Sequence, residues 1–294
     1  MEIQSVAVIG AGTMGSGIAQ VCAQTGWKTW IYDLDNKRLE RSYASIGDYW
    51  KRGIELQKTS VEDVNSWKSN LKLLYELKDL VKPIDLVIEA VPENIDLKRS
   101  IFQKLDQITD RGTILATNTS GLSISKIASS TKFPNRVIGM HFFNPVPQMS
   151  LLELVKHAEI DQHTIDFAKF VGREMGKKTI LVSDTPGFAT SRLGVVLGNE
   201  AIRMLDEGVA SAEDIDFAMR LGYNHPMGPL ELSDLVGLDV RRDILSSLEA
   251  ELADQRYKPH PLLNKLVERG EIGKKVGKGI YDWSDGDKKK QRDF

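Results

Sequence analysis

The sequence predicts an α/β protein with a doubly wound N-terminal sheet, followed by an all-α C-terminal domain. Through residue 183, short β-branched runs alternate with longer segments of helical period, which is typical of a parallel sheet covered by helices on both faces. From residue 184 onward, apolar residues recur at spacings of three and four, and no further strand is evident. The turn-like stretch "DTPG" separates the two patterns. We therefore expect domains at residues 1–183 and 184–294.

The expected elements follow in chain order. Strands are predicted at residues 5–9, 28–32, 84–90, 113–117, 137–143, 151–156 and 179–183. Helices are predicted at residues 36–52, 97–108 and 161–175, and a further helix runs from an N-cap at Ser211 to near Gly222. Residues 36–70 are long and charged for a single crossover, so we expect a helical pair that projects from the sheet.

Composition excludes several classes of protein. The 294 residues include 41% apolar and 27% charged residues, with a net charge of -2, which is typical of a soluble globular protein with no nucleic-acid partner. No run approaches the roughly 18 apolar residues that a membrane helix needs, and no secretory or transit segment is evident. The single cysteine, Cys22, excludes an intrachain disulfide and a multi-cysteine metal site, which fits a reducing cytoplasm.

A glycine-rich turn follows the first predicted strand. Gly10, Gly12 and Gly15 form the pattern G-x-G-x-x-G between that strand and a helical segment, which is the context that a dinucleotide-binding turn requires. The first glycine permits the tight turn, the second lets the backbone approach a pyrophosphate, and the third allows close packing of helix and strand. The N-terminus of the helix would attract the anion. We count Thr13 and Met14, inside the motif, with the cofactor-binding residues.

Asp33 makes a cofactor site more specific. It stands 18 residues beyond Gly15, at the end of the second predicted strand, where a carboxylate can accept hydrogen bonds from ribose hydroxyl groups. A carboxylate there would repel a 2′-phosphate, so NAD is favoured over NADP. Lys37 and Arg38 lie close by and favour NADP instead, since either could bind that phosphate.

His141 is the candidate for proton transfer. It lies near the carboxyl end of a predicted strand, the edge where open α/β sheets bind ligands. If this strand pairs antiparallel with residues 151–156 about a midpoint near Pro147, His141 falls opposite Glu153, with Cβ atoms roughly 5 Å apart. Burying an unpaired carboxylate is costly, so a buried Glu153 needs such a partner; the alternative is an edge-strand carboxylate that points at water. A hydrogen bond to Glu153 would fix the tautomer and leave the other ring nitrogen as a positioned general base.

The sequence resembles the L-3-hydroxyacyl-CoA dehydrogenases, including the bacterial 3-hydroxybutyryl-CoA dehydrogenases. The resemblance covers nearly the whole chain. It is carried, in order, by "VAVIGAGTMGSGIA", "DLVIEAVPEN", "ATNTSGLSI", "GMHFFNPVPQMSLLELV", "DTPGF", "HPMGPLELSDLVGLDV" and "GKKVGKGIYDW". It implies a Rossmann-like NAD domain, a helical C-terminal domain that dimerises, and an active site between the two.

The resemblance also implies roles for individual residues. His141 matches the family's catalytic base, and Glu153 matches the carboxylate that orients it. Ser120 matches a serine that contacts substrate and nicotinamide. Further positions match residues that line the cofactor site: Glu93, Lys98, Asn144 and Lys275. The implied reaction is oxidation of the 3-hydroxyl group of an acyl-CoA with transfer of a hydride to NAD.

One departure from the family keeps alternatives open. After "DTPGF" the family carries an Asn before Arg that helps to position the substrate, whereas Ser191 occupies this place here. A hydroxyl group reaches less far than an amide and has fewer hydrogen-bond partners. A relative that oxidises a free hydroxy acid, like the lambda-crystallin type L-gulonate dehydrogenases, is the second interpretation. A catalytically silent NAD-binding or structural protein is the third.

Two expectations concern partners. A CoA thioester needs basic groups for its phosphates, and Lys51, Arg52 and Lys58 are candidates. The apolar stretch "HPMGPLELSDLVGLDV" is expected to be buried against a twin subunit or an acyl chain, and the resemblance favours a homodimer.

Overall fold

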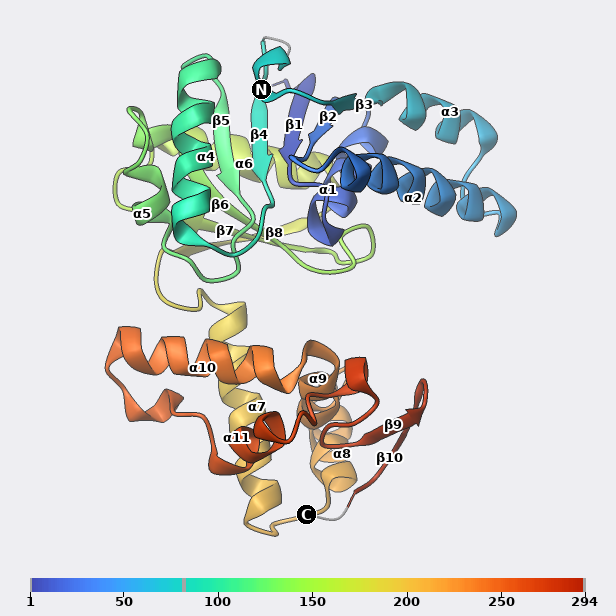
Figure 1. The fold of residues 1–294 in the computed structure, drawn as a ribbon, viewed down its shortest axis with the longest axis vertical. Helices are drawn as coiled ribbons and strands as arrows, with labels where there is room; N and C mark the ends of the chain where they lie inside the picture. Colours follow the sequence, from blue (N-terminus) through green and yellow to red (C-terminus); the bar gives the residue numbers. More distant parts are fainter. Residues whose placement is uncertain (1, 81–82, 293–294) are drawn as a thin grey trace. The chain divides into compact units, whose positions relative to one another are not determined.

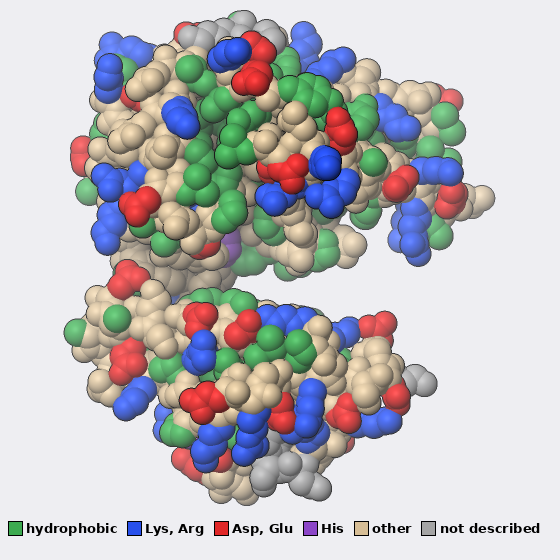
Figure 2. Space-filling model, in the orientation of Figure 1, with side chains coloured by type: hydrophobic (Ala, Val, Ile, Leu, Met, Phe, Trp, Pro, Cys, Tyr) green, Lys and Arg blue, Asp and Glu red, His purple; other side chains and the backbone are tan. Residues whose placement is uncertain are grey.

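The computed structural model describes residues 2–80 and 83–292. The chain divides into two compact units, Met1–Thr185 and Pro186–Phe294, and each has its own hydrophobic core. Figure 1 shows a sheet with flanking helices in the first unit and helices in the second. In Figure 2, basic and acidic side chains are interspersed over the viewed faces of both units. No helix among the described residues is long and apolar enough to cross a membrane.

The first unit is built on an eight-stranded sheet with the order β3-β2-β1-β4-β5-β6-β7-β8. The strands are β1 Ser5–Ile9, β2 Lys28–Tyr32, β3 Leu71–Leu74, β4 Leu86–Glu89, β5 Ile114–Thr117, β6 Val137–Phe142, β7 Leu151–Lys156 and β8 Lys178–Ser183. Neighbouring strands are parallel except for β6 and β7, which form an antiparallel pair. The carboxyl ends of β1, β2, β4, β5 and β6 therefore meet at one edge, where α/β sheets bind ligands.

Helices connect these strands and cover the sheet. They are α1 Thr13–Gln24, α2 Asn36–Glu55, α3 Val61–Asn70, α4 Ile95–Ile108, α5 Ile124–Ala128 and α6 Gln162–Glu174, with 3-10 turns η1 Leu77–Asp79 and η2 Pro134–Arg136. Every residue of β1 is buried, as expected for a central strand covered on both faces.

Helices α2 and α3 extend together away from the sheet (Figure 1). Asp35 caps α2 by accepting hydrogen bonds from two backbone N–H groups, and Ser60 forms a capping box with Asp63 at the start of α3. The rings of Trp50 and Trp67 pack with centroids 5.9 Å apart and join the two helices. The charged surface of residues 36–70 is thus stabilised by an apolar seam.

The second unit is mainly helical. It contains α7 Thr190–Asp206, α8 Ala212–Gly222, α9 Pro229–Val236, α10 Leu238–Leu252 and α11 Pro261–Glu268, the turns η3 Gln255–Tyr257 and η4 Lys274–Val276, and the strands β9 Asp282–Asp285 and β10 Lys288–Lys290. Ser211 caps α8 as the sequence predicts. The expectation of no strand after residue 183 is wrong, because β9 and β10 form an antiparallel ribbon. Trp283, which is buried, anchors this ribbon to the core.

Two buried aspartates hold the second unit together. Asp234 accepts hydrogen bonds from Ile280 N–H and Tyr281 N–H at 2.8 Å each, and from the indole N–H of Trp283 at 2.8 Å. Asp216 accepts hydrogen bonds from two backbone N–H groups in the first turn of α9 and from the Tyr281 hydroxyl group. The C-terminal segment of this unit is therefore fixed to α8 and α9 by carboxylates rather than by helix packing alone.

Strand β3 is the main element of the sheet that the sequence does not predict. It is a four-residue edge strand, "LKLL", that pairs with β2 only. The other expected strands and helices match the observed ones to within three residues at each end. The expected segments 84–90 and 113–117 shorten to β4 and β5, since the residues at their ends lie in the connecting turns.

Candidate active site

The glycine turn has the geometry that its motif predicts. Gly10 has φ +109°, and a Cβ atom there would lie 2.6 Å from the Ala90 carbonyl oxygen. A Cβ on Gly15 would lie only 1.8 Å from the Gly10 carbonyl oxygen, whereas a Cβ on Gly12 would meet nothing within 4 Å. Helix α1 starts at Thr13 and has no side-chain cap. The turn therefore leaves open space in front of backbone N–H groups that favour an anion.

Asp33 is fixed against this turn. Its carboxylate accepts a hydrogen bond from Ala11 N–H at 2.8 Å and another from Asp35 N–H at 2.9 Å, and the side chain is largely buried. A guanidinium nitrogen of Arg38 lies 3.9 Å from the same carboxylate, and the Arg38 side chain is half exposed. The structure thus places an anionic acceptor and a cation side by side at the end of β2.

A cavity of about 500 Å³ adjoins the glycine turn. Its wall includes Gly12 and Thr13 of the turn, Arg38 and Arg41 of α2, and Asn144 from the loop between β6 and β7. The structure thereby brings Asn144 to the same cavity as the glycine turn. The Met14 side chain instead packs against the hydrophobic core.

The pairing of β6 with β7 places His141 directly opposite Glu153, in the register that the sequence predicts. The Nδ1 atom of His141 lies 2.9 Å from Oε2 of Glu153, and Glu153 is completely buried. The His141 ring also packs on Phe143, with centroids 4.4 Å apart. One ring nitrogen is thus engaged by a carboxylate, which fixes the orientation of the ring.

Asn118 is a residue that the sequence reasoning missed. Its side-chain oxygen accepts a hydrogen bond from Phe142 N–H at 2.8 Å, so it joins the end of β5 to the strand residue beside His141. Asn118 stands in the motif "ATNTSGLSI", directly after a predicted strand, but an Asn in a loop has several ordinary roles. Only the strand order shows which one applies.

Glu93, Lys98 and Ser120 come together at the same edge of the sheet. One oxygen of Glu93 accepts hydrogen bonds from Ser120 N–H at 2.9 Å and from the Ser120 hydroxyl group at 3.1 Å. The Lys98 ammonium group lies 3.5 Å from the other oxygen of Glu93. Lys98 is completely buried, so in this structure it reaches the site only through Glu93.

Ser191 and Lys275 belong to the second unit. Ser191 lies in the first turn of α7 and is partly buried. The Lys275 ammonium group lies 2.7 Å from each carboxylate oxygen of Asp239, at the start of α10. Burial of Asp239 is the largest single effect and opposes ionisation, but the hydrogen bond from Lys275, backbone hydrogen bonds and the charge of Lys275 together outweigh it and lower the pKa of that carboxyl group.

The first unit thus combines a turn that fits a bound pyrophosphate with a histidine that can move a proton to or from a hydroxyl group. This combination defines a dinucleotide-dependent oxidoreductase. The 3-hydroxyacyl-CoA dehydrogenase NAD binding domain matches residues 5–185, and the C-terminal domain of the same family matches residues 187–283. The chain belongs to the 3-hydroxyacyl-CoA dehydrogenase family, whose members are NAD-dependent oxidoreductases.

Individual relatives agree over nearly the full length. The chain is 42% identical over 285 residues to a probable 3-hydroxybutyryl-CoA dehydrogenase of Bacillus subtilis, covering 97% of this chain and 99% of the relative. It is 41% identical to the 3-hydroxybutyryl-CoA dehydrogenase of Clostridioides difficile, covering 95% and 99%. The crystal structure of (S)-3-hydroxybutyryl-CoA dehydrogenase PaaH1 from Ralstonia eutropha has a TM-score of 0.92 at 40% identity, covering 96% of this chain and 99% of that chain.

Proposed function

We propose that this protein oxidises the 3-hydroxyl group of an L-3-hydroxyacyl-CoA to a 3-oxoacyl-CoA with NAD, and catalyses the reverse reaction. The observation that carries the proposal is the His141–Glu153 pair at the carboxyl end of β6, in a chain of this family. A free hydroxy acid would need a site with a cation for its carboxylate group, whereas the relatives named above are 3-hydroxybutyryl-CoA dehydrogenases.

In the proposed mechanism, His141 Nε2 accepts the proton of the 3-hydroxyl group, and protonated His141 returns it in the reverse direction. Glu153 holds the ring and stabilises the imidazolium that forms. Ser120 orients the substrate oxygen, with its own position set by Glu93. NAD, when bound, supplies the nicotinamide that accepts the C3 hydride. The residues proposed to hold NAD are the glycine turn, Asp33, Asn144 and Glu93, together with Lys275. Ser191 is proposed to help position the substrate.

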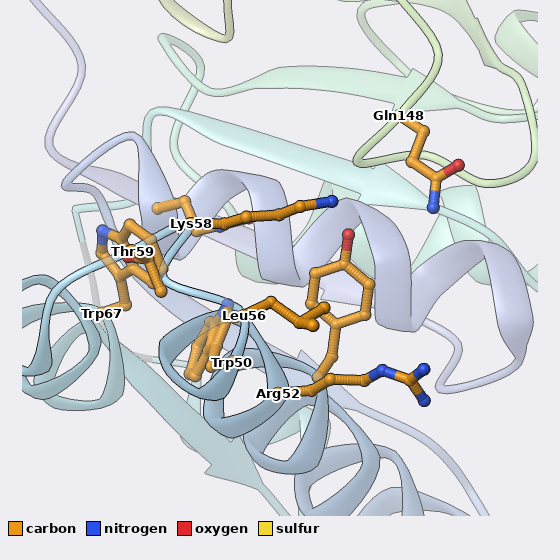
Figure 3. Close-up of a pocket in the computed structure, with 10 residues that line it drawn as sticks. Trp50, Arg52, Leu56, Lys58, Thr59, Trp67 and Gln148 are labelled. Carbon is orange, nitrogen blue, oxygen red and sulfur yellow. The ribbon is translucent and has the colours of Figure 1, made fainter.

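A second cavity supports a CoA thioester as the substrate. It has a volume of about 340 Å³ and lies between the projecting helical pair and the β6–β7 loop. Figure 3 shows Lys58 extending across it toward Gln148, while Arg52 extends from α2. Two cations and an apolar wall that includes Trp67 suit the phosphates and adenine ring of a CoA nucleotide. Lys51, on the same turn of α2, is exposed and does not line this cavity.

The substrate class is tested by a comparison of four substrates with purified protein. We expect rapid NADH oxidation with acetoacetyl-CoA and little with free acetoacetate. Acetoacetyl-N-acetylcysteamine, which lacks the nucleotide, should show a KM at least roughly tenfold higher than acetoacetyl-CoA, because it makes no contact with the second cavity. Faster NAD reduction with L-gulonate would instead establish the free hydroxy acid function, and no turnover with any of these substrates would indicate a silent protein.

The cofactor preference gives a separate prediction. Asp33→Ser removes the negative charge that repels a 2′-phosphate and leaves Arg38, which lies 3.9 Å from that carboxylate, to bind it. We expect the ratio of kcat/KM for NADP to kcat/KM for NAD to rise by roughly a hundredfold or more, which corresponds to about 2.7 kcal/mol. The matched control is Asp48→Ser, on the exposed face of α2. An unchanged ratio in Asp33→Ser would show that this carboxylate does not face the ribose.

We also propose that the second unit forms a homodimer in the cytoplasm. Several large apolar side chains of α8, α9, α10 and the following turns are exposed: Phe217, Leu221, Tyr223, Leu232, Leu235, Val236 and Val240. An apolar set of this size on one unit is typical of a protein interface. The stretch at residues 225–240 contributes Leu230 and Leu238 to the core of its own unit, so only part of it is left for a partner.

A further inference from the structure

We propose that Glu89 and Lys98 form a buried ion pair whose task is to position Glu93, and through Glu93 the serine that contacts the substrate. This inference rests on the proposed function for the role of Ser120. Neither Glu89 nor the pair as a unit is indicated by the sequence motifs, in which Lys98 matches a residue lining the cofactor site. In the structure, both act from beneath the site as positioning residues.

The pair is closed off from solvent. Glu89 is the last residue of β4, Lys98 lies in the first turns of α4, and both are 0% exposed. The Lys98 ammonium group donates a hydrogen bond of 2.6 Å to Oε1 of Glu89. The same Glu89 oxygen accepts a hydrogen bond from Val91 N–H at 2.7 Å, and Oε2 accepts one from the Thr117 hydroxyl group at 2.7 Å. Glu89 thus joins two adjacent strands and a helix.

Lys98 carries this network toward the site. Beyond Glu89, its ammonium group donates to the Val91 carbonyl oxygen at 3.2 Å and lies 3.5 Å from Oε2 of Glu93. The opposite oxygen of Glu93 holds the backbone and hydroxyl groups of Ser120, and also accepts a hydrogen bond from the Thr119 hydroxyl group at 2.6 Å. A single cation therefore fixes one side of a carboxylate whose other side orders the loop after β5.

Energetics argue that the charges serve more than stability. A buried ion pair is expensive to desolvate, and well-packed apolar residues of similar size often stabilise a fold equally well. An apolar pair at these positions would leave Glu93 without its cation. Glu93 is partly exposed, and its carboxylate would then be held from the Ser120 side alone. The charged pair gives Glu93 a fixed orientation at the cofactor edge of the sheet.

Three variants separate positioning from stability. Glu89→Gln and Lys98→Met each leave one buried charge without its main partner, so both should lower the urea midpoint of unfolding. The double variant contains neither charge and should recover most of that loss. We expect the double variant nevertheless to bind NADH roughly tenfold more weakly, measured by fluorescence titration, and to keep a lowered kcat/KM with acetoacetyl-CoA. A double variant with restored stability and normal NADH binding would overturn the proposal.

Glu93→Gln tests the same chain of contacts without disturbing the buried pair. It should unfold at the same urea concentration as the wild type and show the NADH-binding loss of the double variant. Normal NADH binding in Glu93→Gln would equally overturn the proposal, even if the double variant does not fold. Lys104→Met, on the exposed face of α4, is the matched control. The binding readout needs no substrate, so failure of acetoacetyl-CoA as a substrate would refute the proposed function and leave this test intact.

Discussion

His141→Gln should lower kcat for NADH-dependent reduction of acetoacetyl-CoA by roughly a hundred- to ten-thousandfold. Glutamine can keep a hydrogen bond to the buried Glu153 carboxylate, but its amide neither takes up nor releases a proton at neutral pH. The loss should therefore fall on proton transfer rather than on folding or cofactor binding. Steady-state kinetics combined with an NADH titration measures the two separately.

The matched control is His163→Gln, because His163 is exposed on α6. We expect this variant to retain normal kinetics, and we expect His141→Gln to retain its affinity for NADH. A near-normal kcat in His141→Gln would assign the proton to another group. A large loss of NADH affinity would show instead that His141 supports the cofactor site.

Asp234→Ala should destabilise the second unit by about 3 to 9 kcal/mol. The substitution leaves three buried N–H donors, from Ile280, Tyr281 and Trp283, without their acceptor, and each such donor costs about 1–3 kcal/mol. A loss of this size approaches the whole stability of a typical domain. Urea unfolding followed by tryptophan fluorescence measures it. Asp254→Ala is the control, since the Asp254 side chain caps the turn η3 and pairs with Arg256 at the surface, and its loss should cost much less stability.

The pH dependence of the folding stability follows from the Asp234 carboxylate. Burial raises the pKa of Asp234 above its ordinary 3.8, although the three donors and Arg292 oppose the rise. The folded state then binds this proton more tightly than the unfolded state. The resulting stabilisation is fully present below pH 3.8 and is lost as the pH rises through the raised value. Asp234→Asn should abolish that fall, and an unchanged pH profile would contradict the assignment.

The sequence predicts the sheet well where strands are central. Hydrophobic runs such as β1 and β7 have the predicted bounds, because strands buried on both faces are almost continuously apolar. Strand β3 has only four residues, one of them a lysine, and it forms because β2 offers an open edge. Strands β9 and β10 are rich in charge and pair because Trp283 and its carboxylate partner fix them. Both the pairing of β3 and the pairing of β9 with β10 depend on residues distant in the sequence, so the local pattern does not predict them.

The same distinction applies to the candidate site. The His141–Glu153 pair could be predicted, because both residues lie on strands joined by a short connection whose midpoint sets the register. The role of Glu89 could not be predicted, since its partners Lys98 and Thr117 come from a helix and a different strand. The burial of Lys98 likewise depends on how α4 packs on the sheet. Contacts across parallel strands require the strand order, which a single sequence pattern does not contain.

The two hydrophobic cores described above share no residue, and they belong to Met1–Thr185 and Pro186–Phe294 respectively. On the N-terminal side of this junction, Asp184 is held by hydrogen bonds from Ser123 and Ser125. Neither core is therefore left incomplete if the gene is cut at this point. Recombination between relatives at residue 185 should give chimeras that fold, so that the cofactor and CoA-binding residues of one parent can be combined with the helical unit of another.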